Sequence, residues 1–235
     1  MSEEARYLAR WELDGVEGTV VVVDVIRAFT TAAYALAAGA AEIWLADSVD
    51  DALALGAAHR GSVVMGEDHG LRPEGFDLPN SPVMASRADL DGRVVVQRTS
   101  AGTRGAVAAV DADRIFVTGL ATATATARVV GSVGPDAPTY VITGRLPDRP
   151  DRLGPDDLLT AEFVEDVRLG RPVDPAEVAR AVAATEEATR TLALGEGHVH
   201  PDDIAYATDV DRFDFAMEVT PDGIGLRLDR IEPIS

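Results

Sequence analysis

A regular alternation of strand-like and helix-like segments constrains the fold more than any other feature. The first strand, residues 18–23 (GTVVVV), is a continuous run of β-branched residues without polar alternation, which is typical of a strand buried on both faces of a parallel sheet. The segment 25–39 then predicts a helix closed by glycine. Further strands are predicted at 42–45, 62–65, 93–96, 114–117 and 139–142, with helices at 49–58, at about 103–110 and at 119–131.

Six alternations over the first 145 residues predict an α/β fold, with a mainly parallel central sheet and helices on both faces in three α/β/α layers. Residues 1–235 are long enough for one large domain of this kind, with its core at 18–145. We predict an edge strand at 6–13 and a loop at 145–155. The segment 150–235 should hold C-terminal helices at 156–170, 175–194 and 204–207, and a terminal strand pair at 213–219 and 225–231.

The formal net charge of −19 argues against nucleic acid and anionic membranes as partners. No apolar run is long enough to cross a bilayer, and the N-terminal residues lack the apolar segment of a signal peptide. Without cysteine there is no thiolate nucleophile or cysteine-bound metal. These features predict a cytoplasmic protein. A small anionic substrate is still compatible, because local arginines or a metal can reverse the field inside a cleft.

Residues 65–82 (MGEDHGLRPEGFDLPNSP) form a long polar loop that glycine and proline keep from becoming a helix. The chain has no lysine, one asparagine and one glutamine, a bias that removes these residues where they are dispensable. The single asparagine, Asn80, lies in this loop, and the single glutamine, Gln97, ends a predicted strand. We predict a functional loop, with an Ω-like surface loop as the alternative. For Gln97 a structural role is equally compatible.

Ligands of such sheets bind at the carboxyl ends of the strands, and acidic residues stand there. Asp24 follows the first buried strand, as a metal-site or phosphate-site carboxylate would, or as an N-cap of the next helix. Arg27 would suit a phosphate or sulfonate oxygen, or form a salt bridge with Asp24. Glu67 follows a third strand and would suit Mg²⁺, which prefers oxygen ligands. For the neighbouring Asp68, a role as a metal ligand and a place as an ordinary surface residue are equally compatible.

The turn at 97–104 (QRTSAGTR) joins a strand to a helix and offers backbone N–H groups, hydroxyls and arginines to an anion. A plain capping turn is the alternative, and the spacing is not that of a Walker A loop. The histidines at 69, 198 and 200 are interpreted as loop residues. The predicted phosphate-binding residues are Thr99, Ser100, Gly102, Thr103 and Arg104.

Several stretches together resemble the 2-phosphosulfolactate phosphatases of coenzyme M biosynthesis and their bacterial homologues. The stretch GFDLPNSP at 75–82 is the most specific of them. The others are VDVIRA at 23–28 with Thr30 and Thr31, Gly66–Glu67, TSAGT at 99–103, and Asp157. The chain departs from the family pattern at Ala101, where the family has asparagine, and near Thr122, where a second asparagine is missing.

The resemblance implies an α/β fold and Mg²⁺-dependent phosphatase activity on a small phosphorylated, sulfonated hydroxy acid. Our hypothesis is hydrolysis of 2-phospho-3-sulfolactate to 3-sulfolactate and phosphate. Asp24 and Glu67, with Asp157, would hold the metal, and the turn with Arg27 would hold the phosphoryl oxygens. Asn80 and Ser81 would orient substrate or metal-bound water.

Other readings stay open. Attack by water is favoured, but Asp24 could act instead as a covalent nucleophile. The chain could also be a non-catalytic small-anion binding protein, or a phosphoryl transferase on the same scaffold that needs an acceptor other than water. A homodimer is our prediction for the assembly, although a chain of this charge repels copies of itself.

Overall fold

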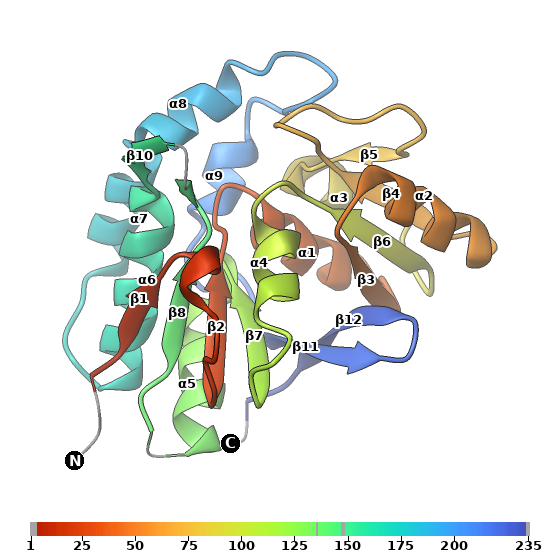
Figure 1. Ribbon diagram of the computed structural model, residues 1–235. Coiled ribbons are helices and arrows are strands. Elements are labelled where there is room, and N and C mark those ends of the chain that lie inside the picture. Colours follow the sequence, from red (N-terminus) through yellow and green to blue (C-terminus); the bar gives the residue numbers. More distant parts are fainter. Residues whose placement is uncertain (1–3, 135, 147–148, 234–235) are drawn as a thin grey trace.

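The computed structural model describes residues 4–134, 136–146 and 149–233, and its centre is a twisted, mixed sheet of ten strands within those ranges (Figure 1). In ladder order the strands are β1 (Arg6–Leu8), β8 (Thr139–Ile142), β2 (Thr19–Val23), β7 (Arg114–Thr118), β11 (Ala216–Asp222), β12 (Gly225–Ile231), β3 (Glu42–Ala46), β6 (Val94–Arg98), β4 (Val63–Gly66) and β5 (Leu78–Pro79).

The sheet consists of two parallel groups joined by one antiparallel hairpin. Strands β1, β8, β2 and β7 are parallel to one another, as are β3, β6, β4 and β5. The hairpin β11–β12 lies between the groups and pairs antiparallel with β7 on one side and with β3 on the other. Figure 1 shows the hairpin connecting the two groups. The predicted terminal strand pair is therefore confirmed, but at the middle of the sheet.

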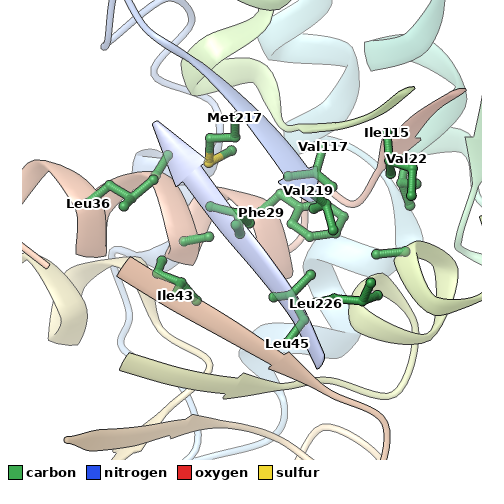
Figure 2. Close-up of a cluster of buried hydrophobic side chains, with 14 of the residues drawn as sticks. Val22, Phe29, Leu36, Ile43, Leu45, Ile115, Val117, Met217, Val219 and Leu226 are labelled. Atoms are coloured by element: carbon green, nitrogen blue, oxygen red, sulfur yellow. The ribbon is translucent and has the colours of Figure 1, made fainter. Parts of the chain in front are cut away.

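Helices cover both faces, which confirms the predicted α/β fold. Alternate residues of β2 show the two faces, because Val22 packs in a cluster with Phe29 of α1, whereas Val23 packs in another with Phe163 of α6. Figure 2 shows the first cluster, where side chains of both strand groups and the hairpin surround Phe29. The helices are α1 (Ala28–Ala37), α2 (Val49–Ala58), α3 (Pro82–Arg87), α4 (Gly102–Ala108), α5 (Ala123–Val133), α6 (Pro155–Arg168), α7 (Pro175–Ala183), α8 (Glu186–Leu192) and α9 (Asp203–Ala207).

Some predicted bounds are wrong for local reasons. The helix predicted at 175–194 is two helices, because Thr185 interrupts it and accepts a hydrogen bond from the Ala188 N–H as the N-cap of α8. The segment predicted as loop at 145–155 contains a two-stranded ladder of β9 (Arg145–Leu146) and β10 (Arg149–Leu153). The edge strand at 6–13 is only β1, followed by the 3₁₀ helix η1 (Arg10–Glu12); a second, η2 (Leu120–Thr122), precedes α5.

The long loop at 65–82 ends in a helix that the sequence analysis did not predict. Ser81 is the N-cap of α3, its hydroxyl accepts a hydrogen bond from the Met84 N–H, and Pro82 occupies the first turn. A membrane-spanning helix is not found in the described part of the chain, since none of its helices is both long and apolar enough.

Candidate active site

Asp24 directly follows β2, at the carboxyl end of that strand. Its Oδ1 accepts a 2.9 Å hydrogen bond from the N–H of Ala28, the first residue of α1. The N-cap position itself is Arg27, so the predicted N-cap role of Asp24 is wrong. The other oxygen, Oδ2, faces Gly102 of α4, where an added Cβ would lie 2.8 Å from it. Burial, with the charge of Glu67 adding to it, raises the pKa of Asp24 to about 6. Asp24 is therefore a buried carboxylate with a raised pKa that bonds to the first residue of α1 without being its N-cap.

The N-terminus of α6 adds two more buried carboxylates. Asp157 accepts a 3.0 Å hydrogen bond from the Val25 N–H at Oδ1, and a 2.8 Å one from the Gly144 N–H at Oδ2. Burial first, and then the charges of Asp156 and Asp24, raise the pKa of Asp157 well above its ordinary value. Asp156 is the neighbouring carboxylate in the first turn of α6. It is buried, its Oδ1 has no hydrogen-bond partner, and burial raises its pKa to about 7.

Glu67 is tied to the predicted phosphate turn. Its carboxylate accepts hydrogen bonds from the N–H and the hydroxyl of Ser100, and from the Gly70 N–H. Arg98 supports the same corner by donating to the Glu67 carbonyl and to the Asp68 carboxylate, each at 2.7 Å. Asp68 therefore pairs with an arginine of the strand end.

The turn at 99–103 closes on itself through two threonines, while Ala101 holds the N-cap position of α4 without a side-chain bond. The Thr103 N–H donates to the Thr99 hydroxyl at 3.0 Å, and the Thr99 N–H donates to the Thr103 hydroxyl at 2.9 Å. Both threonines are buried. Arg104, which we placed among the phosphate-binding residues, is 48% exposed and forms an ion pair with Asp47 at 3.2 Å. The structure thus brings the turn to the buried cluster but directs Arg104 to the surface.

Arg27 and Ser81 meet at a residue that the sequence analysis missed. Asp203, at the start of α9, is fully buried and accepts hydrogen bonds from Arg27 Nη1 at 2.8 Å and from Ser81 Oγ at 2.6 Å. The predicted salt bridge of Arg27 to Asp24 is thus replaced by one to Asp203. Nothing in the sequence around Asp203 distinguishes it, because two adjacent acidic residues are a common pattern in this chain.

Asn80 and Gln97, the one asparagine and the one glutamine of the sequence, are both buried. Asn80 is 4% exposed, and its Oδ1 has no hydrogen-bond partner. A buried acceptor of this kind costs free energy unless a ligand or water satisfies it. Gln97 donates from Nε2 to the Ala28 carbonyl at 2.8 Å, which joins β6 to α1. The Gln97 Oε1 has no hydrogen-bond partner either, so both amides keep an open buried acceptor, and the two interpretations of Gln97 stay open.

A cavity of about 890 Å³ opens beside this cluster, between the 72–79 loop, α3 and the 195–201 loop. Its lining mixes apolar side chains such as Met84 with polar ones such as Arg72 and His200. The 195–201 loop is linked to the buried cluster, because Arg27 Nη1 also donates a hydrogen bond to the His198 carbonyl at 3.1 Å. The cavity is large enough for a small organic acid.

The donor chemistry of the cluster fits Mg²⁺. The predicted ligands Asp24, Glu67 and Asp157 offer only oxygen, and Asn80 adds an unpartnered oxygen. Among the described residues, no three His, Asp or Glu side chains form a ready-made metal-binding group. Mg²⁺ does not need one, because it commonly keeps several waters and takes one or two carboxylates plus a substrate phosphate. The charge of Glu67 adds to the raised pKa of Asp24, and the charges of Asp156 and Asp24 add to that of Asp157, an effect that a bound cation would relieve.

Replacing Gly102 by alanine should separate α4 from Asp24. The added Cβ would lie 2.6 Å from the Ala28 Cβ and 2.8 Å from Asp24 Oδ2. We expect an unfolding free energy lower by about 1–3 kcal/mol, as for overpacking elsewhere, and a phosphate release roughly 100-fold lower because site groups shift. Urea unfolding and phosphate assays measure both. Gly134→Ala is the control, since nothing lies within 4 Å of its added Cβ. Equal behaviour of the two variants would contradict the expectation.

The buried carboxylates should make the metal-free protein less stable as pH rises. Asp24 and Asp156 have pKa values of about 6 and about 7 in the fold, against 3.8 ordinarily. The folded state therefore holds protons that the unfolded chain has lost, and this stability disappears as pH rises through those values. In EDTA we expect the melting temperature to fall by about 5 °C or more between about pH 5.5 and about pH 8.

A pair of charge-matched variants tests the cause of this slope. Asp156→Asn should raise the melting temperature at about pH 8 and flatten the slope, because it removes a buried charge that faces Glu187 and Asp24. Asp113→Asn removes one exposed charge, which accepts from the Gly18 N–H at the opposite end of β2. If both variants reduced the pH dependence of the melting temperature equally, the net charge of the protein, and not the burial of Asp156, would be its cause.

Comparisons of this sequence with known proteins point to the same family that its segments resemble. A family model described as 2-phosphosulpholactate phosphatase matches residues 8–221. A Bacillus subtilis protein named "Probable 2-phosphosulfolactate phosphatase" is 32% identical over 212 residues, which cover 90% of this chain and 91% of that protein. A protein of the same name from Thermus thermophilus is 40% identical over 168 residues, covering 69% and 68%. One from Thermoplasma acidophilum is 30% identical over 177 residues, covering 75% and 76%. The chain therefore belongs to the 2-phosphosulpholactate phosphatase family.

Proposed function

We propose that this chain is a cytoplasmic, Mg²⁺-dependent phosphatase that hydrolyses 2-phospho-3-sulfolactate to 3-sulfolactate and phosphate. The observation that carries the proposal is a set of buried charges around Asp24, since the charges of Glu67 and of the Arg27 guanidinium act on Asp24, and the charge of Asp24 acts on Asp157. Carboxylates suit a metal and a guanidinium suits phosphoryl oxygens. The relatives' names supply the substrate.

Each residue has a role in this proposal. Asp24 and Glu67, with Asp157 behind them, would hold Mg²⁺. The bound ion would offset charge on the phosphoryl oxygens and lower the pKa of a bound water. Arg27 would donate to the phosphoryl oxygens, and Asn80 Oδ1 would accept a hydrogen bond from the attacking water. The water oxygen bonds to phosphorus, and the bond from phosphorus to the ester oxygen breaks. One proton of the water stays on the phosphate, and the other passes to the ester oxygen, which leaves as the hydroxyl of the product.

The test measures phosphate release from a panel of small phosphorylated hydroxy acids, phosphosulfolactate included. Each ester is assayed with Mg²⁺ and with EDTA, at low and at molar salt, because the acidic composition also fits a high-salt cytoplasm. We expect release that needs Mg²⁺ and is fastest with phosphosulfolactate. Release that appears only with an added acceptor would indicate a phosphoryl transferase. Tight binding of an ester without release would indicate a small-anion binding protein.

A further inference from the structure

We infer that Asp203 is a positioning residue that holds Arg27 and Ser81 in place for the reaction. The inference rests on the proposed function, and it adds a residue outside the predicted site to that function. Asp203 lies 176 residues after Arg27 and 122 residues after Ser81, and its carboxylate touches both.

Every contact of the Asp203 carboxylate is with a donor. Oδ1 accepts from Ser81 Oγ at 2.6 Å and from the Val83 N–H at 3.3 Å. Oδ2 accepts from Arg27 Nη1 at 2.8 Å and from the His200 N–H at 2.9 Å. A carboxylate has acceptor sites on both oxygens, which suits these four donors. Because its side chain is fully buried, these four bonds are not exchanged for bonds to water.

Asp203 fixes one edge of the Arg27 guanidinium. Both the bond to Asp203 and the bond to the His198 carbonyl use Nη1, so neither occupies Nε or Nη2. Arg27 is itself 3% exposed, and the charges of Glu67 and Asp24 act on it from the carboxylate cluster. A guanidinium held at one edge and surrounded by carboxylates keeps one orientation, which is what bidentate recognition of a phosphate requires.

The same carboxylate also shapes the neighbouring cavity. It holds the His200 N–H on one side and the Val83 N–H of α3 on the other. His200 and Met84, the residue after Val83, both line the 890 Å³ cavity. Asp203 therefore joins the two walls of that cavity to Arg27. Its loss should disturb substrate placement rather than a single bond.

The experiment is a double-mutant cycle of Asp203→Asn and Arg27→Gln. Steady-state phosphate release gives kcat and KM, and inhibition by inorganic phosphate gives its Ki. We expect Asp203→Asn to lower kcat/KM roughly 100-fold, because a misplaced group costs that much, and to raise the Ki for phosphate. The loss caused by Asp203→Asn should be at least tenfold smaller in the Arg27→Gln background than in wild type, since Asp203 acts mainly through Arg27. Asp113→Asn is the matched control and should stay within about twofold of wild type.

Three results would overturn the inference: an Asp203→Asn enzyme within about twofold of wild type, effects that multiply in the double variant, or an unchanged Ki for phosphate. Circular dichroism checks the fold. If the single variant fails to fold because it leaves Arg27 unpaired, the double variant removes that charge. Its comparison with Arg27→Gln alone then decides, since a further loss below about tenfold supports the inference and one of about 100-fold contradicts it.

If the proposed function is wrong, the assays should give a different result. In that case wild type would release no phosphate from any ester, and calorimetric titration with inorganic phosphate becomes the readout. Weaker phosphate binding by Asp203→Asn than by Asp113→Asn would still support the positioning role. Equal binding by the two variants would overturn it.

Discussion

Replacing Asp24 by asparagine is expected to lower phosphate release about 1,000-fold or more, the scale on which removed electrostatic stabilisation acts in active sites. The asparagine oxygen can keep the bond from the Ala28 N–H, so the first turn of α1 survives. The amide nitrogen at the other position carries no charge and cannot bind a cation. Stability should not fall, because the change also removes a buried carboxylate whose pKa is raised to about 6.

Melting curves and phosphate assays on the same samples check this expectation, with Asp113→Asn as the control for loss of one carboxylate. Activity of Asp24→Asn above a tenth of wild type would contradict a central role for Asp24. Rapid quench of wild type with labelled substrate decides between the two mechanisms left open by the sequence. We expect no covalent phosphate on the protein, and label at Asp24 would show that this residue is the nucleophile.

Replacing Gly66 by alanine is expected to have the largest effect on stability. Gly66 ends β4 opposite Arg98 of β6, with φ +139, a conformation that residues with a Cβ rarely adopt. An added Cβ would lie 1.8 Å from the Arg98 carbonyl oxygen, which is backbone and cannot turn away. That oxygen also accepts the Glu67 N–H at 2.9 Å, so relief of the clash breaks the corner that carries Glu67. We expect a loss of unfolding free energy above about 4 kcal/mol.

Urea unfolding measures this loss, and Gly61→Ala isolates its cause. Gly61 also has a positive φ, +84, but nothing lies within 4 Å of its added Cβ. Its substitution should cost about 1 kcal/mol, from backbone strain alone. If Gly66→Ala were as stable as Gly61→Ala, the contact with the Arg98 carbonyl would not be the reason for glycine at this position.

Local patterns were sufficient to predict β2, β3, β4, β6, β7 and β8 and the residues at their ends, but not β5, β9 or β10. The valine run of β2 indicated burial on both faces. The polar residues after β2 and β4 do act on each other, since the charge of Glu67 is felt at Asp24, but a common strand direction is not the reason. Three antiparallel pairings separate β7 from β3, so the two strand groups run in opposite directions along the ladder. Asn80 was found through composition, and the structure leaves its acceptor without a partner. These inferences depend on residues close together in the chain, where the periodicity of a strand or helix is visible.

The missed features depend on contacts between distant residues. What distinguishes Asp203 from the other acidic residues is its hydrogen bonds to partners 120 or more positions away in the sequence. The sequence alone does not single it out among the 40 Asp and Glu residues of the chain. The position of the hairpin could not be predicted either, because the alternation in β11 says which face is buried but not which strands lie beside it. The surface position of Arg104 follows from the direction of α4, which the turn alone does not set.

The place of the β11–β12 hairpin also has a consequence for synthesis on the ribosome. In the described part of the chain, β7 and β3 are connected in the ladder only through this hairpin, whose residues are 216–222 and 225–231. Both parallel groups leave the ribosome before it, so each exposes one unpaired edge strand until the hairpin is made. A nascent chain arrested before residue 216 should therefore need chaperone protection, and the complete sheet should form only after about 230 residues have emerged.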